Sequence, residues 1–409
     1  MKKWGLTALV LASVLYGAFG SPTPDSPSFL EAGIVCLLAL ATLCGGLDKS
    51  VTREPWFKPL AALIVYGALM GSLQGIFAGN TPSDIARDLV AFSALAIPIA
   101  LWGHRQNARV WLGVLAGIGF AFSCRYLAGP EAVMDNTGND LLYLANSPLV
   151  PFSAAFLLYH GSFVEEGKAR AVLCVLLSLI PTLAMAGMMQ RATLGLLCAL
   201  WLVLLAHTFL HAPKRAFMLC AAFAVSLLAF WPQVEGITDA LIDKTRAVGW
   251  NTRGAELAAL IDTQSANPLS ALFGAGWGSL FKSPAVGDVW VRFSHSFLSS
   301  LWWKTGWIGL LLGVVAIGAV LRSAFLHTRH NPALLFALLL PLVPAIFLYG
   351  SYKSLCFGLL LAALVRPDWT LRGRNVNQTP HDRAPSPPLD PYGQPCVPAD
   401  ARSHGQASA

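Results

Sequence analysis

The stretch ATLGLLCALWLVLLAHTFL, residues 192–210, decides the fold class. It runs for 19 residues without Asp, Glu, Lys or Arg. A helix needs about 20 predominantly apolar residues to cross the hydrocarbon core of a bilayer. The stretch therefore predicts a membrane-spanning helix.

The composition of the whole chain agrees with this prediction. Of the 409 residues, 55% are apolar and 12% are charged, whereas an ordinary soluble domain has about 45–50% and about 25%. Mean hydropathy is +0.59. A single soluble core stops growing near about 250–300 residues, so much of this apolar surface must face lipid. These values exclude a soluble enzyme.

Similar apolar runs predict an all-α polytopic membrane protein with about twelve spans. Spans one to nine fall within 1–231, and spans ten to twelve within 306–366. Between them lies one long loop, 232–305, while the proline-rich, polar residues 367–409 predict a disordered tail. The expected spans are 4–20, 29–47, 57–78, 85–102, 109–128, 147–163, 169–189, 192–210, 216–231, 306–326, 333–349 and 352–366.

The distribution of Lys and Arg predicts the orientation. The short loops 21–28, 79–84 and 129–146 contain neither residue, whereas the alternate loops are basic. Basic loops stay in the cytoplasm, so we expect both termini and the tail to be cytoplasmic and the loop 232–305 to be exported. Residues 1–20 also fit a signal peptide, and that alternative stays open.

The long loop is the expected location of function, because long ordered loops usually carry it. We expect helices over 237–247 and 252–262, then a glycine turn, LFGAGWG, at 272–278. An interfacial helix over 292–304 would lead into the next span.

Cations on the exported side form the first group of candidate residues. Snorkelling toward lipid headgroups is the alternative explanation for any one of them. Arg191 stands out because it lies between two spans with almost no loop around it, and its planar guanidinium suits a phosphate or pyrophosphate. The alternative for Arg191 is an ion pair with an acid. The group comprises Arg191, Lys244, Arg246, Arg253, Lys282, Arg292, Lys304 and Lys353.

His295 is the expected general base. Of nine histidines it is the one placed on the exported side, and an ordinary pKa near 6.5 suits proton transfer from a hydroxyl. A purely structural, hydrogen-bonded histidine is the alternative. Arg253 and Glu256, three residues apart, are also spaced to pair with each other.

Several kinds of chemistry lack their motifs. The chain has no Asp-x-Asp, Walker loop, His-Glu-x-x-His or Gly-x-Ser-x-Gly sequence, and no Cys-x-x-Cys. We therefore expect no metal and no cofactor. The net charge of +7 follows membrane topology, so nucleic acid is not an expected partner.

Within about 188–310 the chain resembles the O-antigen ligase / O-antigen polymerase superfamily. The resemblance lies in Gln190-Arg191-Ala192-Thr193, in Arg253 with Pro268 and Gly274-Ala275-Gly276, and in His295-Ser296-Phe297-Leu298 with Gly306-Trp307-Ile308-Gly309. The chain departs from the family where Ser296 replaces the usual Asn and Leu257 a common aromatic residue.

The resemblance implies a GT-C-like glycosyltransferase of the bacterial inner membrane. Such an enzyme transfers O-antigen glycan from undecaprenyl pyrophosphate to a sugar hydroxyl of lipid A–core at the periplasmic face. It implies His295 as base, with Arg191, Arg253, the weaker candidate Arg246 and Gln190 binding substrate. The alternatives are an O-antigen or exopolysaccharide polymerase, a transferase acting on protein Ser or Thr, and a transporter of lipid-linked glycan.

Overall fold

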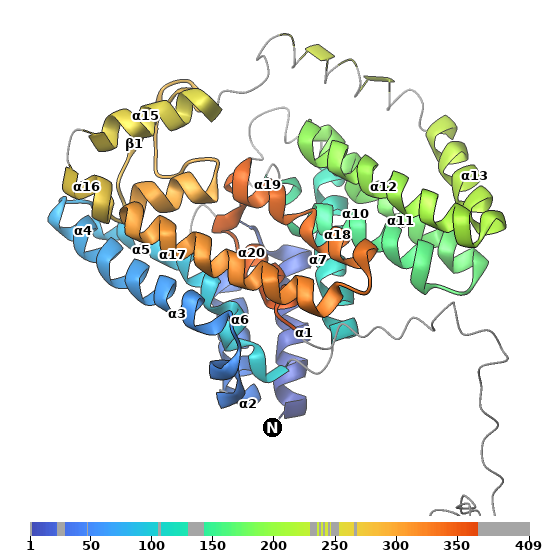
Figure 1. The fold of residues 1–409 in the computed structure, drawn as a ribbon, viewed down its shortest axis with the longest axis horizontal. Coiled ribbons are helices and arrows are strands. Elements are labelled where there is room, and N and C mark those ends of the chain that lie inside the picture. Colours follow the sequence, from blue (N-terminus) through green and yellow to red (C-terminus); the bar gives the residue numbers. More distant parts are fainter. Residues whose placement is uncertain are drawn as a thin grey trace, which may run out of the picture. The chain divides into compact units, whose positions relative to one another are not determined.

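The computed structural model describes residues 2–22, 29–46, 48–104, 108–129, 143–229, 253–265 and 268–366, with a few positions between 235 and 246. The described residues are mostly helical (Figure 1). The chain divides into two compact units, 1–370 and 371–409. The predicted disordered tail, 367–409, and most of the predicted helix 237–247 lie outside the described residues.

The first half of the chain is a succession of helices. Helix α1 packs against α2 and α7, and α10 packs against α7 and α11. The elements are α1 (Lys2–Phe19), α2 (Phe29–Gly45), α3 (Phe57–Tyr66), the π-helical turn η2 (Gly67–Gly71), α4 (Ser72–Phe77), α5 (Pro82–Ser93), α6 (Ile97–Ala100), α7 (Ala108–Ala128), α10 (Leu149–Tyr159), α11 (Lys168–Gly187), α12 (Arg191–His211) and α13 (Pro213–Ala229).

The second half contains a small hairpin as well as helices. Helix α17 lies beside α3 and α16 (Figure 1). The elements are α15 (Arg253–Ser265), α16 (Pro268–Phe273), β1 (Phe281–Ser283), β2 (Val289–Val291), α17 (Phe297–Thr328), α18 (Pro332–Leu339), α19 (Leu342–Phe347), the 3-10 turn η7 (Gly350–Lys353) and α20 (Leu355–Leu364).

Five helices in the described part of the chain are long and apolar enough to cross a membrane. Five shorter apolar helices coincide with the predicted spans 4–20, 29–47, 147–163, 333–349 and 352–366. The predicted span 85–102 is instead divided into α5, a 3-10 turn and α6. The five long helices are Phe57–Phe77, Val110–Ala128, Lys168–Gly187, Arg191–His211 and Phe297–Thr328.

Helix α20 is a core element of the first unit. Every residue from Cys356 to Leu364 is buried, so the helix is covered by protein on all sides. A Cβ atom at Gly358 would collide with the carbonyl of Ala94, which shows how closely the backbones approach. The turn η7, which precedes α20, is therefore attached to a rigid support.

The predicted helix over 292–304 is wrong in its first part. Residues 281–291 form an antiparallel hairpin, with Phe281 opposite Val291, and α17 begins only at Phe297. Two local preferences explain the difference. Val289, Trp290 and Val291 favour a strand, and the Ser296 hydroxyl accepts from the backbone N–H of Ser299 as a helix N-cap. His295 therefore lies in an extended segment between strand and helix.

The glycine turn fixes the long loop to the break in α17. Gly306 interrupts that helix with φ 69° and ψ −170°, and the freed carbonyls of Trp303 and Lys304 accept from Ala275 N and Gly276 N at 2.8 and 3.1 Å. The indole N–H of Trp277 donates to Gly67 O in η2 at 2.7 Å. The loop is thus tied, through backbone carbonyls, to two of the helices that are long and apolar enough to cross a membrane.

Candidate functional site

His295 and Glu256 form the centre of the candidate site. The Nδ1 atom of His295 lies 2.9 Å from Oε1 of Glu256, and the backbone N–H of His295 donates to Oε2 at 3.1 Å. The Ser283 hydroxyl also donates to Oε1, at 3.0 Å. Three donors therefore converge on one carboxylate whose side chain is only 4% exposed.

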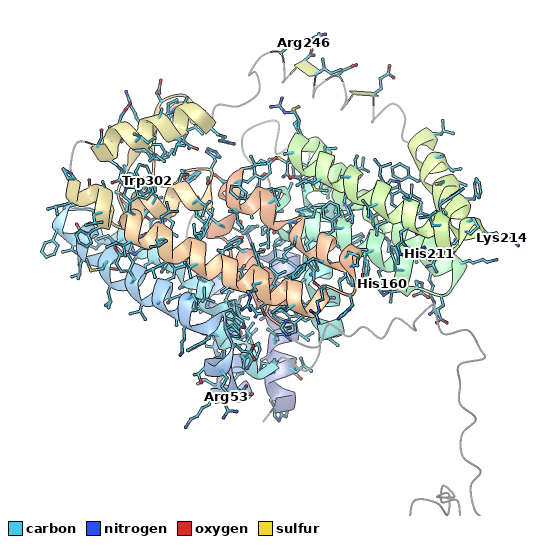
Figure 2. All side chains as sticks on the ribbon, viewed as in Figure 1. Arg53, His160, His211, Lys214, Arg246 and Trp302 are labelled. Carbon is cyan, nitrogen blue, oxygen red and sulfur yellow. The ribbon has the colours of Figure 1, made fainter. Side chains whose placement is uncertain are left out.

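The partner of His295 comes from a different element, and its position is fixed by packing. Glu256 lies in the first turn of α15, which contacts the β1–β2 hairpin and α17. Leu260 of that helix packs in a buried cluster with Phe281, Trp302 and Trp303, and Trp302 is labelled in Figure 2. The carboxylate is thus held by a rigid supporting layer rather than by a flexible loop.

The carboxylate of Glu256 stays ionised in this setting. Burial raises its pKa, but the hydrogen bonds from His295, the charge of His295 and the hydrogen bond from Ser283 outweigh burial, and the pKa lies below its ordinary value. An ionised carboxylate accepts a hydrogen bond from the N–H of Nδ1. That bond leaves Nε2 of His295 as the nitrogen that can accept a proton. This arrangement suits general base catalysis.

A cavity of about 210 Å³ adjoins this pair. His295 contributes to its wall, together with Tyr349 just before η7, Lys353 at the end of η7, and Asn146 and Ser147 from the segment before α10. The volume accommodates several heavy atoms beyond a single water. The basic histidine therefore faces a space in which a substrate group can lie.

Arg191 and Arg253 act electrostatically on Tyr349, a residue of the cavity wall. Burial raises the pKa of Tyr349, and the charges of Arg253 and Arg191 oppose that effect, so both guanidinium groups lie within electrostatic range of the Tyr349 hydroxyl. Burial likewise lowers the pKa of Arg253, against the effect of Glu256 and Tyr349. Tyr349 thus links the three predicted residues: it shares the cavity wall with His295 and lies within electrostatic range of Arg191 and Arg253.

Gln190 has a supporting position. It is 3% exposed, and its side-chain amide donates to Ala145 O at 2.9 Å and to Asn146 Oδ1 at 3.1 Å. Asn146 is a wall residue of the cavity. Gln190 therefore holds the cavity wall, and its contact with substrate stays a prediction.

Arg246 has a different environment from Arg253. Its side chain is 78% exposed and lies 3.7 Å from Asp243, itself 76% exposed, three residues earlier. Figure 2 shows the side chain on the outside of the molecule. Of the two loop arginines, Arg253 is the one on which Glu256 and Tyr349 act electrostatically.

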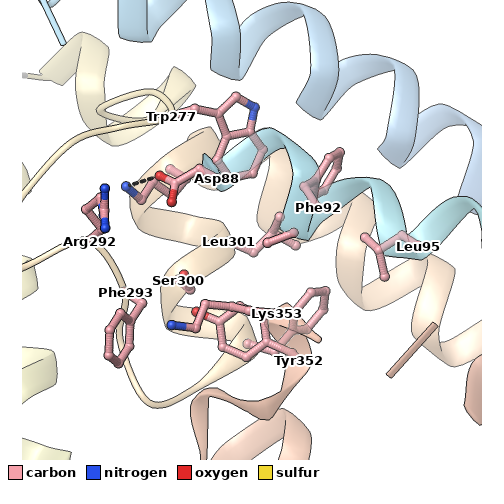
Figure 3. A pocket seen from close by; sticks show the side chains of 13 residues that line it. Asp88, Phe92, Leu95, Trp277, Arg292, Phe293, Ser300, Leu301, Tyr352 and Lys353 are labelled. Carbon is pink, nitrogen blue, oxygen red and sulfur yellow. Dashed lines mark hydrogen bonds and ion pairs between the residues drawn. The ribbon is translucent and has the colours of Figure 1, made fainter. Parts of the chain in front are cut away.

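A second charged cluster lies on the other side of Phe293. Asp84 on α5 pairs with Arg292, and Asp88 pairs with Lys304 at 2.7 Å while also accepting from Gly278 N at 2.8 Å. Figure 3 shows Asp88, Arg292 and Lys353 around a small pocket of about 40 Å³, and Phe293 and Lys353 contribute to both this pocket and the His295 cavity.

Sequence reasoning missed the acids of the site. Asp84 and Asp88 were not considered, although Asp88 is an acid inside the predicted span 85–102 and such acids usually have a functional or structural partner. Glu256 was considered only as a partner for an arginine. No sequence signal singles out Tyr349, which lies near the site because α19 ends there.

In the part of the chain that the structure describes, no group of three or more His, Cys, Asp or Glu residues is arranged to hold a metal ion. Comparison with known proteins gives no relative: no protein-family model, no curated protein and no solved structure matches this chain.

Proposed function

We propose that the protein is an O-antigen ligase of the bacterial inner membrane. It would transfer glycan from undecaprenyl pyrophosphate to a sugar hydroxyl of lipid A–core at the periplasmic face. The observation that carries the proposal is the His295–Glu256 pair beside a cavity whose wall residue Tyr349 lies within electrostatic range of Arg191 and Arg253. The membrane setting rests on the five long apolar helices.

The chemistry requires two contributions from the protein. His295, oriented by Glu256, would remove the proton from the acceptor hydroxyl as it attacks the anomeric carbon. Arg191 and Arg253 would stabilise the charge that develops on the pyrophosphate as the glycosidic bond breaks. A direct displacement inverts the anomeric centre and forms no glycosyl-enzyme. We expect activity in the presence of a chelator, and a trapped covalent intermediate would contradict this mechanism.

A lipopolysaccharide gel tests the proposal in cells. A strain that lacks the gene is complemented with wild type, His295→Ala or Arg191→Ala at equal membrane expression. We expect wild type to restore the high-molecular-weight ladder, and both variants to fail while lipid-linked polymer accumulates. If the strain without the gene carries single repeat units on its core, the protein is a polymerase. An unchanged ladder in all strains would refute both activities.

A further inference from the structure

Lys353 occupies the boundary between the two cavities. It contributes to the wall of the His295 cavity and to that of the small pocket beside Asp88. Its ammonium nitrogen lies 3.1 Å from the centre of the Phe293 ring, and Figure 3 shows it between Phe293 and Ser300. The turn η7 that bears it is followed directly by the buried helix α20, so the side chain projects from a rigid support.

The two carboxylates of the charged cluster beside Phe293 are already bonded to other groups. Asp88 binds Lys304 and Gly278 N, and Asp84 binds Arg292 and Thr81. Among the described residues, Lys353 forms no ion pair with a carboxylate. With Lys353 protonated, the group of Asp84, Asp88, Arg292, Lys304 and Lys353 carries one more positive than negative charge and can accept an anion.

The surroundings also bring the pKa of Lys353 close to neutral pH. Burial lowers its pKa to about 7, Asp88 opposes this, and Arg292 and Lys304 add to it. An anion that binds beside the amine would raise that pKa and draw a proton onto the nitrogen. The charged and titratable groups that share a cavity wall with it are Asp88, Arg292, Lys304 and Tyr352 in the small pocket, and Tyr143, His295 and Tyr349 in the His295 cavity.

We propose that Lys353 is a third cationic binding residue of the site, and that its ammonium group binds the pyrophosphate of the donor in the His295 cavity. This assignment rests on the proposed function, because it takes a pyrophosphate as the ligand. Arg191 and Arg253 lie within electrostatic range of Tyr349 in the wall of the same cavity. Lys353 would add a charge that is present only when the amine is protonated.

Binding of inorganic pyrophosphate to the purified full-length protein in detergent tests this role without any glycan transfer. Calorimetry is run at pH 6 and pH 8 on wild type, Lys353→Met, Lys353→Arg and the control Lys282→Met. Lys282 is an exposed lysine of β1. The protonation of pyrophosphate itself also changes with pH, and this change is the same in every experiment. The ratio of each variant's affinity to that of wild type therefore reports changes in the protein alone.

We expect Lys353→Met to bind about tenfold or more weakly than wild type at pH 6, as loss of a charge-assisted bond predicts, with a smaller difference at pH 8. The affinity of Lys353→Arg for pyrophosphate, relative to that of wild type, should increase as the pH rises, because arginine keeps its proton. Lys282→Met should match wild type. Equal affinities of Lys353→Met and wild type at both pH values, with wild type binding, would overturn the assignment.

Failure of the proposed function would give a different result. If wild type binds pyrophosphate through Lys353 but transfers no glycan, the anion site stands and the ligase activity fails. If wild type transfers glycan but Lys353→Met binds pyrophosphate and transfers as well as wild type, only the role of Lys353 fails. Should Lys353→Met melt well below wild type, the pH dependence of Lys353→Arg against wild type decides the question.

Discussion

Replacing Glu256 by Gln should impair His295 as a general base while leaving its imidazole in place. The carboxylate accepts hydrogen bonds from His295 Nδ1 at 2.9 Å, His295 N at 3.1 Å and Ser283 Oγ at 3.0 Å. A glutamine amide has one oxygen for these donors, which lie on both carboxylate oxygens, so at least one N–H or O–H would face an NH₂ group. The negative charge that fixes the protonated Nδ1 would also be lost.

The size of the effect follows from these bonds. Hydrogen bonds to a charged group contribute about 1.5–3 kcal/mol each, and a buried donor left without an acceptor costs about 1–3 kcal/mol. Loss of about 2–4 kcal/mol of transition-state stabilisation corresponds to a rate lower by about 30- to 1000-fold. Ser283→Ala removes one neutral donor and keeps the carboxylate, so we expect a loss of about tenfold or less.

The assay is the initial rate of glycan transfer in proteoliposomes, with His295→Ala as the reference for loss of the base. Melting temperatures measured in the same detergent separate misfolding from a chemical defect. If folded Glu256→Gln transfers glycan at the wild-type rate, Glu256 does not orient the base and this account of the pair is refuted. A loss equal for Ser283→Ala and Glu256→Gln would also contradict it.

Three further predictions concern stability and the choice of arginine. Gly306→Ala should lower the free energy of unfolding by at least about 1–3 kcal/mol, because the positive φ at this position is strained for alanine and a Cβ would strike Leu272 O. Gly318 faces open space in the same helix, so Gly318→Ala should leave the stability unchanged. Thermal melting checks both variants. Arg253→Ala should abolish most transfer while Arg246→Ala changes it by less than about twofold, as expected for an exposed pair; equal losses in the transfer assay would contradict this. The lowered pKa of Glu256 means that its stabilising contribution is full above its ordinary pKa and is lost as the pH falls through the folded-state value. On acidification below pH about 4.5, the melting temperature should therefore fall more for wild type than for Glu256→Gln, and parallel curves would argue against an ionised carboxylate.

The sequence predicted the helical membrane class because that property depends on local composition. Residues 192–210 contain no acid, Lys or Arg, and the structure has a helix there, Arg191–His211, long enough to cross a membrane. Lengths were less predictable. The segment over 352–366 is apolar enough for a span, yet its helix, Leu355–Leu364, is short and fully enclosed by protein. Apolar composition alone does not distinguish contact with lipid from contact with other helices.

The candidate site could be predicted only in part, because the sequence does not show which side chains meet in the folded chain. His295, Arg191 and Arg253 could be chosen as candidates because unusual charges at a membrane face are visible in sequence. Their neighbours depend on tertiary contacts: Glu256 reaches His295 because α15 packs on Trp302 and Trp303. The error over 292–304 arose because helical spacing of polar residues was preferred to the strand preference of Val289–Val291 and the capping preference of Ser296.

Transfer by the purified protein tests the central claim most directly. Wild type and His295→Ala are reconstituted in proteoliposomes with undecaprenyl-pyrophosphate-linked glycan and lipid A–core, with and without EDTA, and the glycan-bearing lipid A–core is measured. The account predicts product from wild type in both conditions and a rate at least about 100-fold lower from His295→Ala, the usual contribution of a general base. A wild-type rate from His295→Ala, or no product from wild type, would contradict it.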